Sequence, residues 1–242
     1  MEHSNIVEFS IFGDYALFSN PDTSVGGEKC SYQIPTYEAL KGILKSVYWK
    51  PTIIWYIDKV RIMNPFDRTE TKGILTLKYS GGNDLAYYTY LKDCHYQVSA
   101  HFEWNKNRPE LEADHNENKH YEIAKRMIER GGRRDIFLGT RECQGYVEPC
   151  VFGEDTGAYD DLDLFSFGHM FHSITYADEA FSEETRNRKT LNFWYPEMKN
   201  GIIKFLRPQD CPNHKYIHEM EMKKFGADRQ NFTGIKEFEE VR

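Results

Sequence analysis

The sequence has 242 residues, of which 40% are hydrophobic and 29% are charged, a balance typical of a globular protein with one large domain or two smaller ones. No apolar run approaches the roughly 20 residues that span a bilayer, and the first residues lack the features of a signal peptide, so we expect a cytoplasmic protein with no membrane partner. The scattered cysteines form no Cys-x-x-Cys pair, so we expect no disulfide framework. The net charge of −7 by itself argues against a polyanionic partner.

The first half of the chain is predicted to alternate strands and helices. Residues 6–12 mostly alternate apolar and polar side chains, which favours a strand. A helix is expected to begin at Thr36, which suits the N-cap position, and to end at Pro51. A strongly β-prone run follows over residues 52–63, and residues 64–86 are expected to be a loop or a hairpin that turns at Gly81-Gly82-Asn83.

A second helix and two more strands complete this pattern. Residues 87–104 are again extended, and Asn116 or Asn118 can cap a helix that Gly131-Gly132 would stop. A last strand is expected over residues 142–152. The order strand, helix, strand, strand, helix, strand predicts an α+β protein with a ferredoxin-like N-terminal domain, the class that includes the RNA-recognition fold.

The pattern changes after residue 152, so we predict two domains, over residues 1–152 and 153–242. Short β-like pieces at 165–176, 191–195 and 201–205 indicate a smaller, β-rich C-terminal part. Residues 154–185 hold nine acidic residues and no Lys or Arg, so the rest of the chain carries a net charge of +2. The polar tail after Lys223 is expected to be disordered.

The basic residues gather in one segment. Residues 119–141 contain seven basic and three acidic residues, which is compatible with nucleic acid and equally with a solvated face. Arg133, Arg134 and Arg141 are the best phosphate clamp, because guanidinium forks match phosphate oxygens, whereas each of the lysines taken alone could simply aid solubility. The candidate RNA-binding residues are Lys29, Lys41, Lys45, Lys50, Arg133, Arg134 and Arg141.

Lys119 and His120 at the start of the second helix are candidates for acid–base chemistry. RNA is cut without a metal when its own 2′-OH attacks the adjacent phosphate, and this reaction needs a base, an acid and a cation. The positive end of the helix dipole disfavours a protonated His120, so its neutral imidazole could act as a base. Lys119 could neutralise a phosphate. The alternative is a polar, solvated first helical turn.

Tyr48, at the end of the first helix, has two interpretations. It shares a helical face with Leu40 and Leu44, which favours a buried aromatic residue. The pKa of an unperturbed tyrosine is about 10, so in a catalytic site Tyr48 would donate a proton or a hydrogen bond rather than act as a base.

Metal and cofactor motifs are weak in this sequence. Asp114, His115 and His120 lie near one another, but their spacing fits no standard zinc site, and Cys94-His95 is equally unconvincing. Residues 26–29 lack the pattern of a phosphate-binding loop. We therefore predict no metal ligands and no cofactor.

Several motifs together resemble a known family. They are FGDYALF (12–18), GGEK (26–29), PTY (35–37), YWKPT (48–52), YTYLKD (88–93), KHY (119–121), GGRRDIFLG (131–139) and RECQGYV (141–147). The sequence resembles the fifth Cas family in its Dvulg form, the repeat-processing subunit of type I-C CRISPR systems, from about residue 7 to about residue 215. The acidic segment near residues 154–190 is the part of the chain that matches least well.

The resemblance implies a function and a set of site residues. It implies a ferredoxin-like domain with a smaller β-rich part, and metal-independent cutting of precursor CRISPR RNA at the 3′ base of the repeat hairpin. It also implies that the protein keeps the 5′ handle, so its partners would be the repeat hairpin with its flanks and the other subunits of the type I-C surveillance complex. The catalytic Tyr, Lys and His of the family correspond to Tyr48, Lys119 and His120.

Two other functions stay open at this point. The first is a non-catalytic subunit that only grips the RNA handle, as other members of the wider family do. The second is a metal-dependent DNA nuclease, which the lack of a carboxylate cluster argues against.

Overall fold

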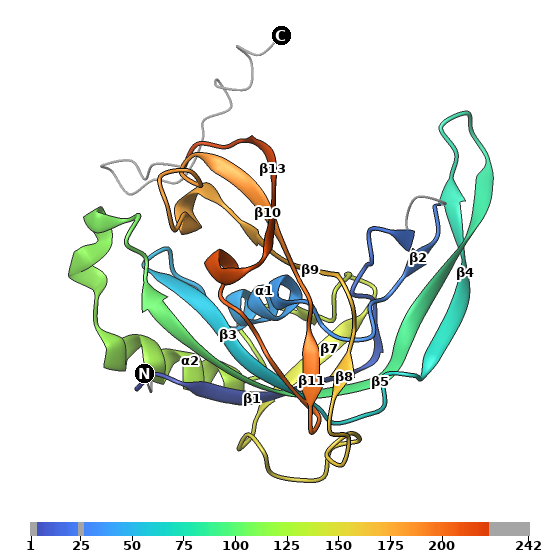
Figure 1. Ribbon diagram of the computed structural model, residues 1–242, viewed down its shortest axis with the longest axis horizontal. Coiled ribbons are helices and arrows are strands. Elements are labelled where there is room, and N and C mark those ends of the chain that lie inside the picture. Colours follow the sequence, from blue (N-terminus) through green and yellow to red (C-terminus); the bar gives the residue numbers. More distant parts are fainter. Residues whose placement is uncertain (1–3, 24–26, 223–242) are drawn as a thin grey trace.

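The computed structural model describes residues 4–23 and 27–222 of the chain, and it is an α+β protein built mostly from antiparallel sheet (Figure 1). Gly26 and the predicted disordered tail after Lys223 lie outside the described residues. No helix in the described ranges is both long enough and apolar enough to cross a membrane.

In the described residues, α-helices and short 3-10 helices accompany the strands. The helices are α1 (Tyr37–Val47), α2 (Glu117–Glu129), η2 (Pro109–Asp114), η3 (Ala177–Glu179) and η4 (Pro208–Asp210). The strands are β1 (Val7–Ala16), β2 (Lys29–Cys30), β3 (Ile53–Ile62), β4 (Thr69–Leu77), β5 (Asn83–Trp104), β6 (Ile136–Phe137), β7 (Gln144–Pro149), β8 (Phe165–Ser166), β9 (Met170–Thr175), β10 (Arg188–Trp194), β11 (Glu197–Lys199), β12 (Ile202–Lys204) and β13 (Asn213–Glu219).

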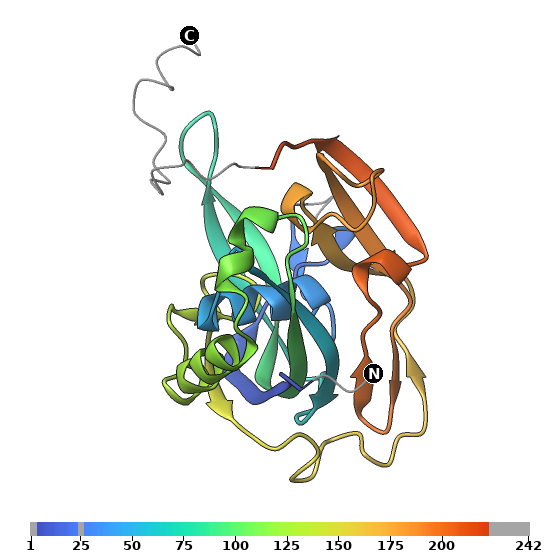
Figure 2. The same ribbon diagram turned by 90° about the vertical axis from the view of Figure 1, so that its left-hand side faces the viewer.

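The main sheet is organised around β5, a strand of 22 residues. Its strand order is β6-β7-β1-β5-β3-β12-β11-β8, and β2 and β4 also pair with β5. Side chains of the sheet alternate between two faces, so Phe9 and Ile11 of β1 and Val98 and Ala100 of β5 enter one hydrophobic core. Both α-helices pack against this core (Figures 1 and 2).

The predicted helix caps are confirmed. The Thr36 side chain accepts a hydrogen bond from the backbone N–H of Ala39 at 3.2 Å, and Asn116 rather than Asn118 caps α2 by accepting from the N–H of Lys119 at 3.0 Å. The first helix ends at Val47, before Pro51, because Tyr48 already has an extended backbone with φ −154° and ψ 125°. Tyr48 is therefore the C-cap residue of α1 and lies outside the helix, whose face it was predicted to share with Leu40 and Leu44.

The hairpin between β4 and β5 is also confirmed. Gly81 and Gly82 have φ values of +88° and +82° at its turn, a backbone conformation that favours glycine. The hairpin projects from the rest of the protein (Figure 1).

The C-terminal part contributes to two sheets. The predicted strand over residues 165–176 is divided into β8 and β9, with Gly168 at φ +75° between them. Strands β9, β10 and β13 form a separate sheet, whereas β8, β11 and β12 extend the main sheet because β12 pairs with β3. The sequence did not predict this extension of the main sheet.

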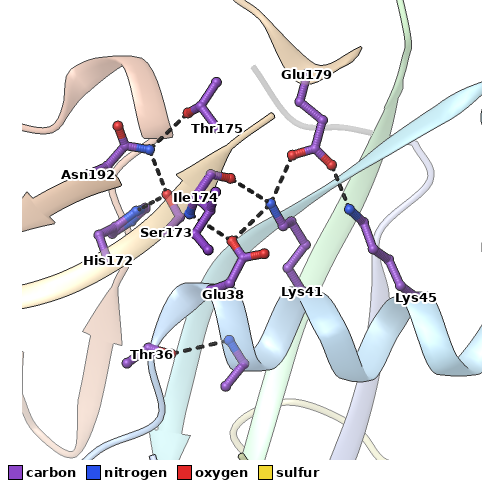
Figure 3. Close-up of polar contacts among 11 residues, drawn as sticks. Thr36, Glu38, Lys41, Lys45, His172, Ser173, Ile174, Thr175, Glu179 and Asn192 are labelled. Atoms are coloured by element: carbon purple, nitrogen blue, oxygen red, sulfur yellow. Dashed lines mark hydrogen bonds and ion pairs between the residues drawn. The ribbon is translucent and has the colours of Figure 1, made fainter. Parts of the chain in front are cut away.

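Lys41 corrects one prediction about the RNA-binding surface. Its side chain is only 2% exposed and forms ion pairs with Glu38 at 3.0 Å and with Glu179 at 2.9 Å, and its ammonium also donates to the backbone carbonyl of Ile174 (Figure 3). The prediction that Lys41 extends the basic surface is therefore wrong. Lys45, which is 30% exposed, binds the second oxygen of Glu179 at 2.6 Å.

This network joins α1 to the C-terminal part. The carboxylate of Glu38 accepts the backbone N–H of Ile174 in β9 at 2.9 Å, and Glu179 belongs to η3 (Figure 3). Burial alone would raise the pKa of Glu179, but the charges and hydrogen bonds of Lys41 and Lys45 lower it to about 2. The carboxylate therefore stays ionised inside the protein.

Replacing Lys41 tests the importance of this network. We expect Lys41→Ala to lower the free energy of unfolding by about 3–5 kcal/mol, because it leaves a buried carboxylate without its main partner. Urea unfolding at pH 7 measures the change. Lys78→Ala is the control, because Lys78 forms an exposed ion pair with Asp84 at 3.6 Å and should change stability by about 0.5 kcal/mol or less.

The same experiment at lower pH gives a second check. The pKa of Glu179 is depressed in the folded protein, so its contribution to stability is complete above its ordinary pKa of 4.5 and is lost as the pH falls toward about 2. The difference in the free energy of unfolding between Lys41→Ala and Lys78→Ala should therefore shrink as the pH falls through this range. Equal stability of Lys41→Ala and Lys78→Ala at pH 7 would contradict the assigned role.

Candidate active site

The candidate site lies where the end of α1 meets the start of α2. Tyr48 follows the last turn of α1, and His120 lies in the first turns of α2, on the face that also buries Ala124 and Ile128. The phenol oxygen of Tyr48 lies 2.7 Å from Nδ1 of His120. The structure therefore brings together two residues that are 72 positions apart in the sequence.

The hydrogen bonds of His120 determine its tautomer. Its Nε2 lies 2.9 Å from the backbone carbonyl oxygen of Asp114, and a carbonyl oxygen can only accept, so Nε2 carries a proton. In the neutral ring Nδ1 is then an acceptor, and it accepts a hydrogen bond from the Tyr48 hydroxyl. Both ring nitrogens of His120 thus form hydrogen bonds.

Aromatic rings enclose this pair. Trp104 and Phe102 of β5 present edge-to-face contacts to the His120 ring, with centroid distances of 5.6 Å and 6.2 Å. His120 is 0% exposed and Tyr48 is 3% exposed. Burial, together with the charge of Asp114, raises the pKa of Tyr48 to about 12, and the charge of Arg133 opposes this rise. Tyr48 is therefore a neutral hydrogen-bond donor at pH 7.

Lys119 provides an accessible charge at the same place. Its side chain is 47% exposed, and its ammonium forms an ion pair with Oδ1 of Asp114. The other carboxylate oxygen, Oδ2, accepts from the Thr52 hydroxyl at 3.0 Å and lies 3.4 Å from Nε2 of His120. All three predicted catalytic residues therefore lie within one connected group of contacts.

Asp114 is the residue that sequence reasoning missed. In the sequence, Asp114 stands out only as a weak metal ligand, although it lies two residues before the N-cap Asn116 and five residues before Lys119. The hydrogen bond from Lys119 holds the pKa of Asp114 below its usual range, the Thr52 hydroxyl and His120 lower it further, and partial burial opposes them. Asp114 is therefore an ionised carboxylate.

Part of the predicted basic set adjoins this group. The backbone N–H groups of Arg133 and Arg134 donate to the carbonyl of Ser46, near the end of α1, at 3.2 Å and 3.1 Å. Both of these arginine side chains are exposed, as is Lys50, two residues after Tyr48. The positive φ values of the preceding Gly131 and Gly132, +78° and +104°, turn the chain toward α1.

The other predicted basic residues lie elsewhere. Arg141 is exposed, with its guanidinium 5.9 Å from the centre of the Phe137 ring. Lys29 belongs to β2, and its ammonium lies 5.0 Å from the centre of the Tyr88 ring. Lys41 is buried, as described above. The basic set is therefore not one continuous patch.

Metal-binding geometry is not found in the described part of the chain, where no three His, Cys, Asp or Glu residues group closely enough to hold an ion. Cys94 is buried, and burial raises the pKa of its thiol to about 11. His95 forms a hydrogen bond of 2.7 Å between its Nε2 and the Ser10 hydroxyl.

Comparison with known proteins places the chain in a family. Residues 6–206 match the family described as CRISPR-associated protein (Cas_Cas5). The chain belongs to this family. All three predicted catalytic residues of this Cas5 protein, and the arginines at 133, 134 and 141, lie within the matched range.

Named relatives and a solved structure are similar to this Cas5 protein. It is 28% identical over 229 residues to the CRISPR pre-crRNA endoribonuclease Cas5d of Mannheimia succiniciproducens, which covers 83% of this chain and 94% of the relative. It is 30% identical over 182 residues to the Cas5d of Thermus thermophilus, covering 72% and 75%. A crystal structure of a CRISPR-associated protein superposes with a TM-score of 0.69 and 31% identity, covering 87% of this chain and 96% of that one.

The contact between Tyr48 and His120 can be tested through stability. We expect Tyr48→Phe to lower the free energy of unfolding by about 1–3 kcal/mol, because the buried Nδ1 of His120 loses its donor. Denaturant unfolding measures this change, and Tyr146→Phe is the control because the Tyr146 side chain is 56% exposed. Equal stability of the two variants would show that the contact does not form.

Proposed function

We propose that this Cas5 protein is a metal-independent endoribonuclease that cuts precursor CRISPR RNA at the 3′ base of the repeat hairpin. The observation that carries the proposal is the convergence of Tyr48, Lys119 and His120, three residue types that suit cleavage by the 2′-OH of the RNA. The names of the two relatives, both CRISPR pre-crRNA endoribonucleases, support it.

The proposed reaction is an internal transfer of the phosphoryl group. The 2′ oxygen forms a bond to phosphorus and loses its proton, while the bond from phosphorus to the 5′ oxygen breaks and that oxygen gains a proton. We assign the proton transfers to Tyr48 and His120, which share a hydrogen bond of 2.7 Å. We assign stabilisation of the phosphate charge to Lys119, the most exposed of the three side chains.

The enclosure of His120 sets a condition on this mechanism and favours a second candidate function. The His120 side chain is 0% exposed, so part of the surrounding structure has to move before RNA can reach the imidazole. A protein in which His120 stays enclosed would be a non-catalytic subunit that binds the RNA handle. Binding without cutting is therefore the second candidate.

We propose the same partners for either function. They are the repeat hairpin with its flanks, held by Arg133, Arg134 and Arg141 together with Lys50, and the other subunits of the type I-C surveillance complex. The 5′ handle stays bound after cutting. The cytoplasm, where the transcripts are made, is the proposed location.

We also propose the finer description of the fold. The elements β1, α1, β3, β5, α2 and β7 would form a ferredoxin-like unit, which the antiparallel neighbour order β7-β1-β5-β3 supports. Residues 1–152, which contain this unit, and residues 153–242 would be the two domains of the chain. Because β12 pairs with β3 and Lys41 pairs with Glu179, we expect these domains to unfold together.

A cleavage assay in excess EDTA tests the catalytic proposal. Wild-type protein should cut the host repeat RNA once, below the hairpin, and should not cut RNA that lacks the 2′-OH at that position. His120→Ala should lose cutting and keep its affinity for RNA. His218→Ala is the control because its side chain is exposed, and it should cut like wild type.

Other results would redirect the function. Tight binding by wild type without cutting would support the handle-binding subunit. Cutting that requires magnesium would overturn the metal-independent mechanism.

A further inference from the structure

Asp114 connects the two parts of the candidate site. Its Oδ2 accepts from the hydroxyl of Thr52, which lies in the turn that follows Tyr48. Its Oδ1 accepts from Lys119, and its backbone carbonyl accepts from Nε2 of His120 at 2.9 Å. One residue therefore contacts the turn after α1 and the beginning of α2.

These contacts restrict groups that would otherwise move. A lysine ammonium on a four-carbon stem has many rotamers, and the ion pair with Asp114 selects those that place it near His120. Thr52 is 2% exposed and is held by a hydrogen bond from the N–H of Asn105 to its carbonyl at 2.8 Å. The carboxylate is thus anchored on a rigid part of the fold.

We propose that Asp114 is a positioning residue for RNA cleavage, whose carboxylate holds the Lys119 ammonium beside His120 and ties both to the turn that follows Tyr48. This inference rests on the proposed function. Asp114 acts through Lys119 and His120 rather than on the RNA, because protein donors occupy both of its carboxylate oxygens. Its negative charge also repels phosphate, so its removal should not weaken RNA binding.

The test is single-turnover cleavage by Asp114→Asn. Asparagine keeps the shape and the backbone carbonyl but removes the charge, and its amide nitrogen cannot accept a hydrogen bond. We expect the maximal rate to fall by about 10- to 100-fold, the effect of a small misplacement of a catalytic group. The protein concentration at half-saturation should stay unchanged or decrease. Asp84→Asn is the control, because Asp84 is an exposed carboxylate paired with Lys78.

Two further variants separate positioning from folding. Asp114→Asn should add little to the loss caused by Lys119→Ala, because both changes remove the same contact. Thr52→Val keeps the ion pair and loses one anchor, so its maximal rate should fall less, at unchanged RNA affinity. If Asp114→Asn is too unstable to assay, Thr52→Val provides the test instead. Cutting by Thr52→Val at the rate of the wild-type protein would then overturn the proposal.

Three results with a folded Asp114→Asn protein would overturn the inference. They are a wild-type rate, a fall in rate matched by an equal fall in RNA affinity, and full additivity with Lys119→Ala. Failure of the proposed function looks different, because wild-type protein would then not cut, whereas failure of this inference alone leaves wild type active and His120→Ala inactive.

Discussion

The long strand β5 is the constraint on which the rest of the structure depends. It pairs with β1 and β3 along its second half and with β4 along its first half. Because alternate side chains of a strand point to one face, the same register that buries Val98 and Ala100 also directs Phe102 and Trp104 toward His120. The surroundings of the candidate site therefore follow from the pairing of the sheet.

The end of β5 also sets the position of the turn that follows Tyr48. The backbone N–H of Asn105 donates to the carbonyl of Thr52 at 2.8 Å, and the Asn105 side chain donates to the carbonyl of Pro51 at 3.2 Å. The indole N–H of Trp55 donates to the carbonyl of Tyr48 at 2.8 Å. Tyr48 and His120 thus meet on a framework of strand and turn hydrogen bonds rather than on mobile loops.

Local signals in the sequence predicted the helices and most strands, because caps, periodicity and turn glycines act over a few residues. Thr36 and Asn116 are examples. The burial of Lys41 depends on Glu179, which is 138 residues away, and the pairing of β12 with β3 also joins residues that are far apart in the sequence. No local pattern reports such contacts. Asp114 was missed for another reason: its contacts depend on how η2 folds back over α2.

The acidic segment has a structural use that bears on RNA binding. Asp160 pairs with the buried Arg61 at 2.6 Å, and the guanidinium of Arg61 also donates to the carbonyls of Glu154 and Asp155. Acidic groups of this segment thus engage cations that lie inside the protein. Exposed cations such as Arg133 and Arg134, beside the candidate site, stay available to phosphate.

The central claim is that the RNA supplies its own nucleophile, and the chemical identity of the new RNA ends tests it most directly. Mass spectrometry of the two fragments made by the wild-type protein in EDTA gives this identity. The account predicts a 2′,3′-cyclic phosphate on the upstream fragment and a free 5′-hydroxyl on the downstream fragment. A 3′-hydroxyl with a 5′-phosphate would show that water attacks the phosphorus from outside the RNA, and would contradict the roles given to Tyr48, Lys119 and His120.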